Sequence, residues 1–516
     1  MRRLFGVLFI VLLLLDSCAK TKEYPFRKLS FQTVSQLQNT DFATPNSLIR
    51  IHIDSLRLKT KDTNYIDIVC DKYYAEHNPY LWINRSGTGL KSDTLLKWID
   101  GIDTTGIPEN KLFVSAIREN LTRLHNLDFD HEHTATKTMA ALEYYLTKSY
   151  LRYSCGQRFG FTNPAKSLNS LDHVEKDSVN SPYRHLFNLP IEKINKTFLS
   201  NAFRCIREDN INAFLADVQP TSNLYKLLVQ EYNHNSNYKV RRTLAVNIER
   251  SRWRQAFNHK ERYILVNIPS QCLIAVNPDV DSTLTMKICY GSRKYKTPLV
   301  TSQINYLEVN PYWIIPQSIV KRDIVPHNLN DTNYYNRKRF KIIKRSTGEF
   351  ISPLNVNAAM MLSGQYLIRQ DRGEDNSLGK MIFRFPNPFS IYLHDTNDKS
   401  AFNSAYRAVS HGCIRLERPF DLAAFIYTDK DENFLDHIRL TINIPPITEE
   451  GMALLRKMEQ NENTDRNPHR YFKFDSPVPL YILYYTAFPA YEGGPLQFYP
   501  DVYGYDDLLA DQLFAV

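Results

Sequence analysis

The stretch IYLHDTNDKSAFNSAYRAVSHGCIRLERP, residues 391–419, decides which fold the sequence predicts. It ends in a Ser-His-Gly-Cys-Ile-Arg run, and a second histidine, His394, stands upstream. A cysteine nucleophile needs a nearby base and donors for an oxyanion. The glycine before Cys413 removes a side-chain obstacle and permits a backbone in which successive N–H groups converge. Residues 410–416 are therefore predicted to supply a nucleophile and an oxyanion hole.

The two histidines of this stretch have different predicted roles. Strand alternation places Tyr392 and His394 on one face, and an imidazole carried on a strand is rigid enough to act as a general base. The glycine between His411 and Cys413 indicates a turn, in which His411 points elsewhere. Taken separately, His394 fits a satisfied core histidine and Cys413 a buried thiol. Taken as one cluster, they favour catalysis.

The hydrophobic period changes along the chain and predicts an α+β fold. Residues 46–255 follow a helical pattern and predict a helical N-terminal scaffold domain. Residues 262–445 contain short, β-branched runs bounded by Pro, Asn, Asp and Gly, which predict a β-rich domain. A polar, basic insertion at 317–364 interrupts that domain and is expected to have no core of its own. Residues 446–516 are predicted to form a C-terminal extension that packs on the β-rich domain.

The N-terminus has the pattern of an export signal. Two arginines precede an apolar run at residues 4–15, which would span only about 18 Å as a helix and is too short to cross a bilayer. Leu15-Asp16-Ser17-Cys18 resembles a bacterial lipobox, although aspartate is unusual at its second position. We expect residues 1–18 to be a lipoprotein signal peptide with Cys18 as the lipidated first mature residue, followed by a tether at 19–45. An ordinary cleaved signal is the alternative.

Composition narrows the class of protein. The 516 residues are 43% hydrophobic and carry a net charge of +9, which suits a globular protein. The positive residues are scattered, and no nucleic-acid-binding signature accompanies them. The cysteines show no CxxC spacing and no Cys/His pairing typical of zinc, so no metal site is expected. An anionic envelope polymer or a lipid headgroup suits diffuse positive charge equally well.

The motifs resemble a known family. His394, a 15-residue gap and the Ser410–Arg415 run resemble the signature of the L,D-transpeptidase (YkuD-type) catalytic domain. YGSRKYKTP at 290–298, NPYWIIPQSI at 310–319 and DNSLGKMIFRFPNPFSIYLHDT at 375–396 resemble the long, scaffold-bearing subclass typified by YcbB. Segments of the helical region and of the C-terminal extension resemble it too.

This resemblance implies a strand-dominated catalytic fold with two sheets and an insertion that caps the active-site groove. It implies that Cys413 is the nucleophile and His394 the proton donor and acceptor, with no metal or organic cofactor. The other site residues that it implies are the amides of His411, Gly412 and Cys413 as the oxyanion hole, Tyr392, Asp395 (through its backbone carbonyl), Ser410 and Arg415 in support, and Trp313 and Asn376 as substrate-binding candidates.

The implied activity is a peptidoglycan L,D-transpeptidase in the bacterial periplasm, attached to the membrane by its lipid anchor. Cys413 would form a thioester with a tetrapeptide stem donor, and the amine of an acceptor stem would resolve it to a 3→3 cross-link in cell-wall biogenesis. The sequence leaves two alternatives open. One is an L,D-carboxypeptidase or endopeptidase that hydrolyses the same thioester, and the other is a non-catalytic envelope-binding lipoprotein. Many relatives carry a small helical peptidoglycan-binding module before the catalytic domain. Here LYKLLVQEY is followed within a few residues by RRTLAVNIERSRW, so we expect no such module at that place.

Overall fold

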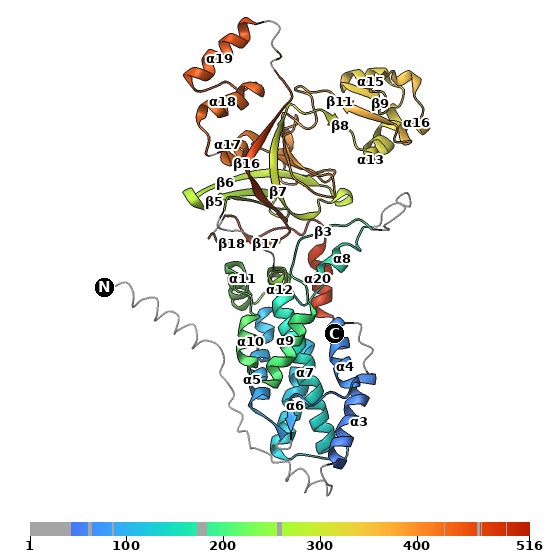
Figure 1. Ribbon diagram of the computed structural model, residues 1–516, viewed down its shortest axis with the longest axis vertical. Coiled ribbons are helices and arrows are strands. Elements are labelled where there is room, and N and C mark those ends of the chain that lie inside the picture. The colour runs from blue at the N-terminus through green and yellow to red at the C-terminus, as the bar shows by residue number, and fades with distance from the viewer. Residues whose placement is uncertain are drawn as a thin grey trace, which may run out of the picture. The chain divides into compact units, whose positions relative to one another are not determined.

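The computed structural model describes residues 43–515 except 60–63, 85–86, 173–182, 255–260, 428, 462–464, 466 and 492. The predicted signal peptide, Cys18 and nearly all of the tether lie outside the described residues. The described residues form two compact units. One comprises those within 43–164, 191–254 and 505–515, and the other those within 165–190 and 261–504. The first unit is helical and the second is rich in β-strands (Figure 1), so the predicted α+β fold is confirmed.

The helical unit is built around the long helix α7, which most of the other helices contact. Its elements are α3 (Ala43–Lys59), α4 (Tyr65–Ala75), β1 (Ile83–Asn84), β2 (Gly87–Thr88), α5 (Leu90–Ile99), η1 (Ile102–Thr105), η2 (Glu109–Leu112), α6 (Val114–Asn126), α7 (Ala135–Phe159), α9 (Lys196–Arg207), α10 (Ile211–Asp217), α11 (Asn223–His234), α12 (Tyr238–Arg252) and α20 (Tyr505–Phe514).

Helix α7 is buried on nearly every side, so its polar side chains need partners. The carboxylate of Glu143 accepts the consecutive amides of Leu81, Trp82 and Ile83 at 2.6, 2.8 and 3.1 Å, and the hydroxyl of Tyr74 at 2.7 Å. Burial raises the pKa of Glu143, while these donors oppose the rise. A segment before α5 is thereby pinned to the central helix.

Two predicted boundaries between the units are wrong. The last helix, α20, belongs to the helical unit, where Asp507 pairs with Arg242 at 2.7 Å and Leu509 and Leu513 are buried. Residues 165–190, expected in the helical domain, belong to the β-rich unit, because strand β3 (Phe187–Asn188) pairs with β7. Both segments are short and distant in sequence from the units they join, so local patterning does not reveal their partners.

The β-rich unit combines a large sheet with helices that follow it in sequence. Its elements outside the insertion are α8 (Pro164–Leu168, at the unit boundary), β3, β4 (Tyr263–Asn267), β5 (Cys272–Asn277), η3 (Pro278–Val280), β6 (Ser282–Gly291), η4 (Arg293–Tyr295), β7 (Leu299–Val309), β12 (Met381–Arg384), β13 (Leu393–His394), η7 (Ser400–Asn403), β14 (Ala408–Ser410), β15 (Ile414–Leu416), α17 (Pro419–Ile426), α18 (Glu432–Thr441), α19 (Glu449–Gln460), β16 (Arg470–Leu483), β17 (Ala487–Pro489) and β18 (Leu496–Phe498).

The large sheet closes into a barrel. Its strand order is β12-β13-β15-β6-β5-β4-β16-β7, and β7 pairs back with β12. The pairs β13–β15 and β16–β4 are parallel, whereas the other neighbours along this path are antiparallel. Closure gives each strand of the ring a paired neighbour on both sides over at least part of its length. The two sheets expected of the catalytic fold therefore appear as one closed barrel.

The insertion has its own sheet and its own core, contrary to the prediction from its polar, basic sequence. Its elements are β8 (Trp313–Ile314), α13 (Gln317–Ile319), η5 (Val320–Ile324), α14 (Val325–Asn328), α15 (Thr332–Arg337), β9 (Phe340–Lys344), β10 (Phe350–Ile351), η6 (Pro353–Asn355), α16 (Ala358–Leu362) and β11 (Tyr366–Gln370). Four strands pair in the order β10-β9-β11-β8.

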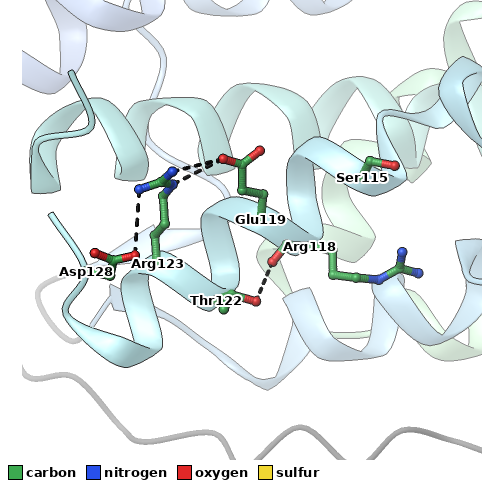
Figure 2. Close-up of a pocket in the computed structure, with 6 residues that line it drawn as sticks. All are labelled: Ser115, Arg118, Glu119, Thr122, Arg123 and Asp128. Carbon is green, nitrogen blue, oxygen red and sulfur yellow. Dashed lines mark hydrogen bonds and ion pairs between the residues drawn. The ribbon is translucent and has the colours of Figure 1, made fainter. Parts of the chain in front are cut away.

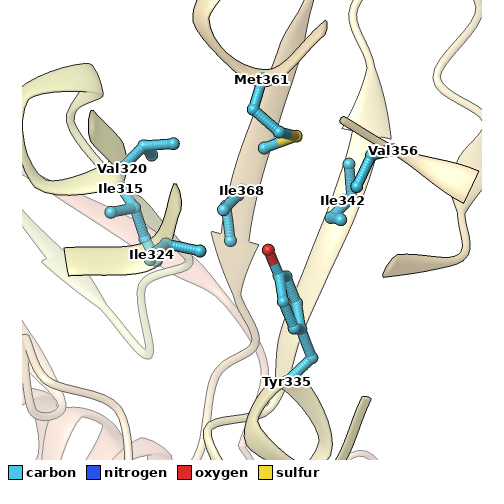
Figure 3. Close-up of a cluster of buried hydrophobic side chains, with 8 residues drawn as sticks. All are labelled: Ile315, Val320, Ile324, Tyr335, Ile342, Val356, Met361 and Ile368. Carbon is cyan, nitrogen blue, oxygen red and sulfur yellow. The ribbon is translucent and has the colours of Figure 1, made fainter. Parts of the chain in front are cut away.

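The core of this subdomain consists of eight side chains that converge between the sheet and its helices (Figure 3), namely Ile315, Val320, Ile324, Tyr335, Ile342, Val356, Met361 and Ile368. The core was hard to predict because the basic run at residues 336–345 contains strand β9. Along that strand, side chains alternate, so Ile342 points inward and Lys341 outward. The prediction that the segment cannot build a core is therefore wrong, and the subdomain spans residues 313–370 rather than 317–364.

Candidate active site

The pairing of β13 with β15 brings the two ends of the 391–419 segment together. His394 pairs with Arg415 in parallel register, and the amide of Ile414 donates to the carbonyl of Tyr392 at 3.1 Å. Side chains alternate along a strand, so Tyr392 and His394 share one face. Cys413 lies beside Tyr392 on that face, because residues in register point the same way. We call this surface of the barrel wall the catalytic face.

Tyr392 lies against both predicted catalytic side chains. Its ring centroid is 5.7 Å from that of His394, in an edge-on arrangement. Its backbone and its hydroxyl both interact with the Cys413 thiol in the sense that lowers the pKa of that thiol. Burial raises the pKa of Tyr392 itself, so at neutral pH its hydroxyl is a hydrogen-bond donor and not a phenolate.

Burial keeps both partners of the predicted dyad neutral. It raises the pKa of Cys413 to about 11, against the lowering effects of Tyr392, Arg384 and Arg415. It also lowers the pKa of His394, which is 4% exposed, to about 4, and the Arg415 charge acts in the same direction. If Cys413 is the nucleophile and His394 its base, as the sequence predicts, a neutral thiol beside a neutral imidazole favours general base catalysis over attack by a preformed thiolate.

The imidazole of His394 has one ring nitrogen without a partner. Among the described residues, no group stands in hydrogen-bonding geometry with its buried Nδ1. Backbone groups of Asp395 and Leu378 lie near enough to oppose the fall in its pKa. The hydrogen bond expected from the ring to the Asp395 carbonyl therefore stays a prediction. The Asp395 carboxylate anchors the following loop, accepting from the Lys399 amine at 2.6 Å and the Lys380 amide at 2.9 Å.

The turn before β15 is held by Ser410. Its hydroxyl donates to the carbonyl of Cys413 at 2.5 Å and accepts the amide of Gly412 at 3.1 Å. Gly412 has φ +115°, a region that other L-residues rarely adopt, whereas the space around it would admit a Cβ. Glycine is needed here for its backbone. Because the Gly412 amide is already bonded, only the amides of His411 and Cys413 remain without an acceptor among the described residues.

Hydrogen bonds from two residues that the sequence did not single out, Thr297 and Tyr503, support this turn. The buried hydroxyl of Thr297 donates to the carbonyl of Gly412 at 2.9 Å and accepts the amide of Gly291 at 2.9 Å. The hydroxyl of Tyr503 accepts the amide of Thr297 at 3.0 Å and donates to the carbonyl of Gly291 at 2.6 Å. The run YGSRKYKTP carried a signal for Thr297, but Tyr503 comes from the far end of the chain and had none.

His411 faces the inserted subdomain instead of the thiol. Its ring centroid is 4.7 Å from that of Tyr295, and the guanidinium of Arg322 lies 5.0 Å from the Tyr295 centroid. Arg322 belongs to η5 of the insertion, so this stack connects the insertion to the catalytic turn. That His411 points away from Cys413 stays a prediction, and the contact with Tyr295 is compatible with it.

The two substrate-binding candidates differ in availability. Trp313 lies on β8 and is partly buried against the core of the insertion. Its side chain forms a hydrogen bond with the side chain of Tyr392. Asn376 is 1% exposed, and its amide group donates to the carbonyls of Pro311 and Asp371 while its oxygen accepts the amide of Leu378. Asn376 therefore holds the loop before β12 through its side-chain amide, which does not support the predicted contact of this residue with a substrate.

Family models match both units of the chain. Residues 261–436 match the L,D-transpeptidase catalytic domain (YkuD), and residues 69–231 match the scaffold domain. The chain carries an L,D-transpeptidase catalytic domain. Its combination with a scaffold domain is the architecture of the long, YcbB-like subclass, as the sequence motifs predicted.

A curated relative supports the assignment. A Haemophilus influenzae protein that is named as a candidate L,D-transpeptidase is 28% identical over 310 residues, which cover 58% of this chain and 56% of the relative. The chain thus matches little more than half the length of that relative.

Other features of the described residues do not add a second centre. A hollow of about 380 Å³ lies on α6 of the scaffold unit (Figure 2), where Arg123 pairs with Glu119 and Asp128. Its charges neutralise one another, and it contains no predicted site residue. Cys272, which is half-buried, and Cys289, which is buried, are free thiols. Within the described ranges, no group of three His, Cys, Asp or Glu could hold a metal, and no helix is long and apolar enough to cross a membrane.

The buried state of His394 predicts how the transpeptidase domain responds to acid. The folded protein holds this imidazole neutral down to about pH 4, whereas the unfolded chain protonates it near pH 6.5. The contribution of His394 to the free energy of unfolding is therefore present above about pH 6.5 and is lost as the pH falls toward 4. By pH 4.5 the pKa difference corresponds to a loss of about 2 to 3 kcal/mol.

We expect His394→Gln to lose less stability than the wild type between pH 7 and pH 4.5, by about that amount. Denaturant unfolding at the two pH values measures the difference, and His437→Gln, at an exposed position of α18, is the control. An identical loss in wild type and His394→Gln would contradict a buried neutral imidazole.

Proposed function

We propose that this chain is a peptidoglycan L,D-transpeptidase that forms 3→3 cross-links through a thioester on Cys413. The observation that carries the proposal is the catalytic face, where one strand register aligns His394, Tyr392 and Cys413 next to a turn with two unoccupied amides. A thiol, a base and convergent donors are the parts that acyl transfer from an amide requires.

In the acylation step, the sulfur of Cys413 attacks the carbonyl of the third residue of a tetrapeptide stem as His394 takes the thiol proton. The oxyanion of the tetrahedral intermediate is received by the amides of His411 and Cys413. The bond to the terminal D-amino acid then breaks, and the leaving amine takes its proton from the imidazolium. The products are a thioester and a free D-amino acid.

In the second step, the side-chain amine of an acceptor stem attacks the thioester while His394 takes its proton. The thiol is released with that proton, and an amide bond links the two third residues. The neutral ground state of both catalytic groups suits this cycle, because the imidazole is ready to accept a proton at each attack. No step requires a metal or an organic cofactor.

Replacement of the two catalytic groups tests this assignment. Cys413→Ala should abolish the thioester and the cross-linked product, whereas His394→Ala should slow acylation by about 10² to 10⁴-fold, the usual contribution of a general base. Intact-mass spectrometry with a tetrapeptide muropeptide measures the adduct, and product chromatography measures dimers. Cys289→Ala, which removes a buried thiol of β6, is the matched control and should keep the activity.

The same experiment separates the alternatives. Trimmed monomers without dimers would show an L,D-carboxypeptidase or endopeptidase, in which water resolves the thioester. A wild-type protein that forms neither adduct nor product would indicate a non-catalytic envelope-binding lipoprotein. Adduct formation that survives Cys413→Ala would place the nucleophile elsewhere.

We further propose that the inserted subdomain caps the thioester and limits its hydrolysis. The stack of Arg322, Tyr295 and His411 supports this role, because it connects the insertion to the turn that carries Cys413. A cap that excludes water favours an amine acceptor over hydrolysis.

Arg322→Ala should therefore raise the hydrolysed fraction of the thioester by several-fold while acylation continues. Chromatographic quantification of monomers and dimers after acylation gives the ratio. Arg337→Ala, an exposed arginine of α15 in the same insertion, should leave the ratio unchanged. An unchanged ratio in Arg322→Ala would rule out capping through this contact.

The N-terminal pattern supports a periplasmic location with a lipid anchor on Cys18. Expression with a labelled fatty acid should label the wild type and not Cys18→Ala, and the variant should be recovered outside the membrane fraction. Equal labelling of both proteins would disprove lipidation at this residue.

A further inference from the structure

The catalytic face extends beyond β13 onto β12 and β7. Antiparallel register pairs Ile382 with His394 and Phe383 with Leu393, so the next position, Arg384, lies opposite Tyr392. On the other side of β12, Arg384 pairs with Tyr306 of β7. Arg384 therefore stands in the same cross-strand row as Tyr392 and Cys413.

The guanidinium of Arg384 is held in a fixed orientation. Its Nε donates to one carboxylate oxygen of Glu308 at 2.8 Å, and its Nη2 forms an ion pair with the same oxygen at 2.7 Å. The other oxygen of Glu308 is 3.0 Å from Nε2 of His469. Glu308 is only 6% exposed, so this carboxylate has few alternatives. The plane of the guanidinium also rests against Tyr392, with its central carbon 4.6 Å from the ring centroid.

One edge of this guanidinium remains free. Within the described parts of the chain, Nη1 has no protein partner, although the side chain is only 31% exposed. Glu308 occupies the opposite edge and cannot turn to serve both. An arginine that is anchored along one edge and open at the other presents a donor pair of the geometry that carboxylates prefer.

We propose that Arg384 is the subsite for the C-terminal carboxylate of the donor stem. The inference rests on the proposed function, since it needs a stem peptide acylating Cys413. Two strand spacings separate Arg384 from Cys413, which is about 10 Å between backbones. The long side chain of Arg384 covers part of this distance, and the terminal residue of the stem, bound next to Cys413, would cover the rest.

The chemistry of the donor selects this carboxylate. The scissile bond joins the third and fourth residues, so the terminal carboxylate lies one residue from the attacked carbonyl. It leaves with the D-amino acid, which means that Arg384 holds the leaving group and not the acyl chain. A subsite of this kind recognises stems that end one residue after the reacting centre.

Two donor stems that differ only at the C-terminus test the proposal. One is a tetrapeptide with a free carboxylate, and the other is the same peptide with a carboxamide. The rate of Cys413 acylation is followed for both by intact-mass spectrometry, in the wild type and in Arg384→Gln. Any effect of Arg384 on the thiol itself is shared by the two peptides and cancels in their ratio.

We expect the wild type to prefer the carboxylate by about 10- to 100-fold in kcat/KM, the range of a charge-assisted hydrogen bond. In Arg384→Gln the ratio should fall to near one through loss of the carboxylate peptide alone. Arg384→Lys should keep part of the preference, which guards against a misfolded glutamine variant. Arg418→Gln removes an arginine that pairs with Asp421 at 2.9 Å and should keep the wild-type ratio.

The outcomes separate the subsite from the proposed function. Equal acylation by both peptides in the wild type, or a preference that survives in Arg384→Gln, overturns the subsite alone. A wild type acylated by neither peptide removes the proposed function and this subsite with it. Loss of preference in Arg418→Gln would show that net charge, and not Arg384, selects the carboxylate.

Discussion

The structure of the site depends on one short parallel pairing, that of β13 with β15. Parallel neighbours require a long crossover, here residues 395–413, and this one contains only short regular elements. The crossover is fixed to the barrel by Arg407, whose guanidinium donates to the carbonyls of Ile288 and Gln271 at 3.0 Å each. Together with the pairing of β14 with β6, these bonds keep the crossover ordered, which favours a fixed geometry between Cys413 and His394.

Placing the pair on the wall of a closed barrel also sets its electrostatics. His394 pairs with strand neighbours on both sides, β12 and β15, so water reaches it poorly. Desolvation disfavours the charged form of each group and moves the two pKa values apart, with the acid above neutrality and the base below it. Arg384 and Arg415 oppose this effect on the pKa of the thiol, and Arg415 reinforces it on the pKa of the imidazole. As a result, both Cys413 and His394 are neutral at neutral pH.

The sequence predicted those parts of the fold and site that depend on local patterning. Alternation was enough to put Tyr392 and His394 on one face, and the residues around Cys413 indicated the turn. Arg384 was not found, because its place opposite Tyr392 depends on a strand register that no local pattern encodes. The bonded amide of Gly412 and the buried amide of Asn376 were missed for a related reason, since the partner that occupies each group follows from loop geometry. The insertion was misjudged because its inward positions are few and lie among charged residues.

The separate core of the insertion bears on how a cap can serve a two-step reaction. A segment without a core would order only when bound, and its ordering entropy would oppose closure. A subdomain with eight buried side chains is already ordered, so closure has to fix only its position. The contacts described at the catalytic turn are a cation over a ring and a ring against a ring, which are worth about 0.5 to 2 kcal/mol each. In the proposed reaction, contacts of that strength would hold the cap over a thioester yet yield to an acceptor stem that offers comparable binding energy, so that a second substrate could enter while the cap limits the access of water.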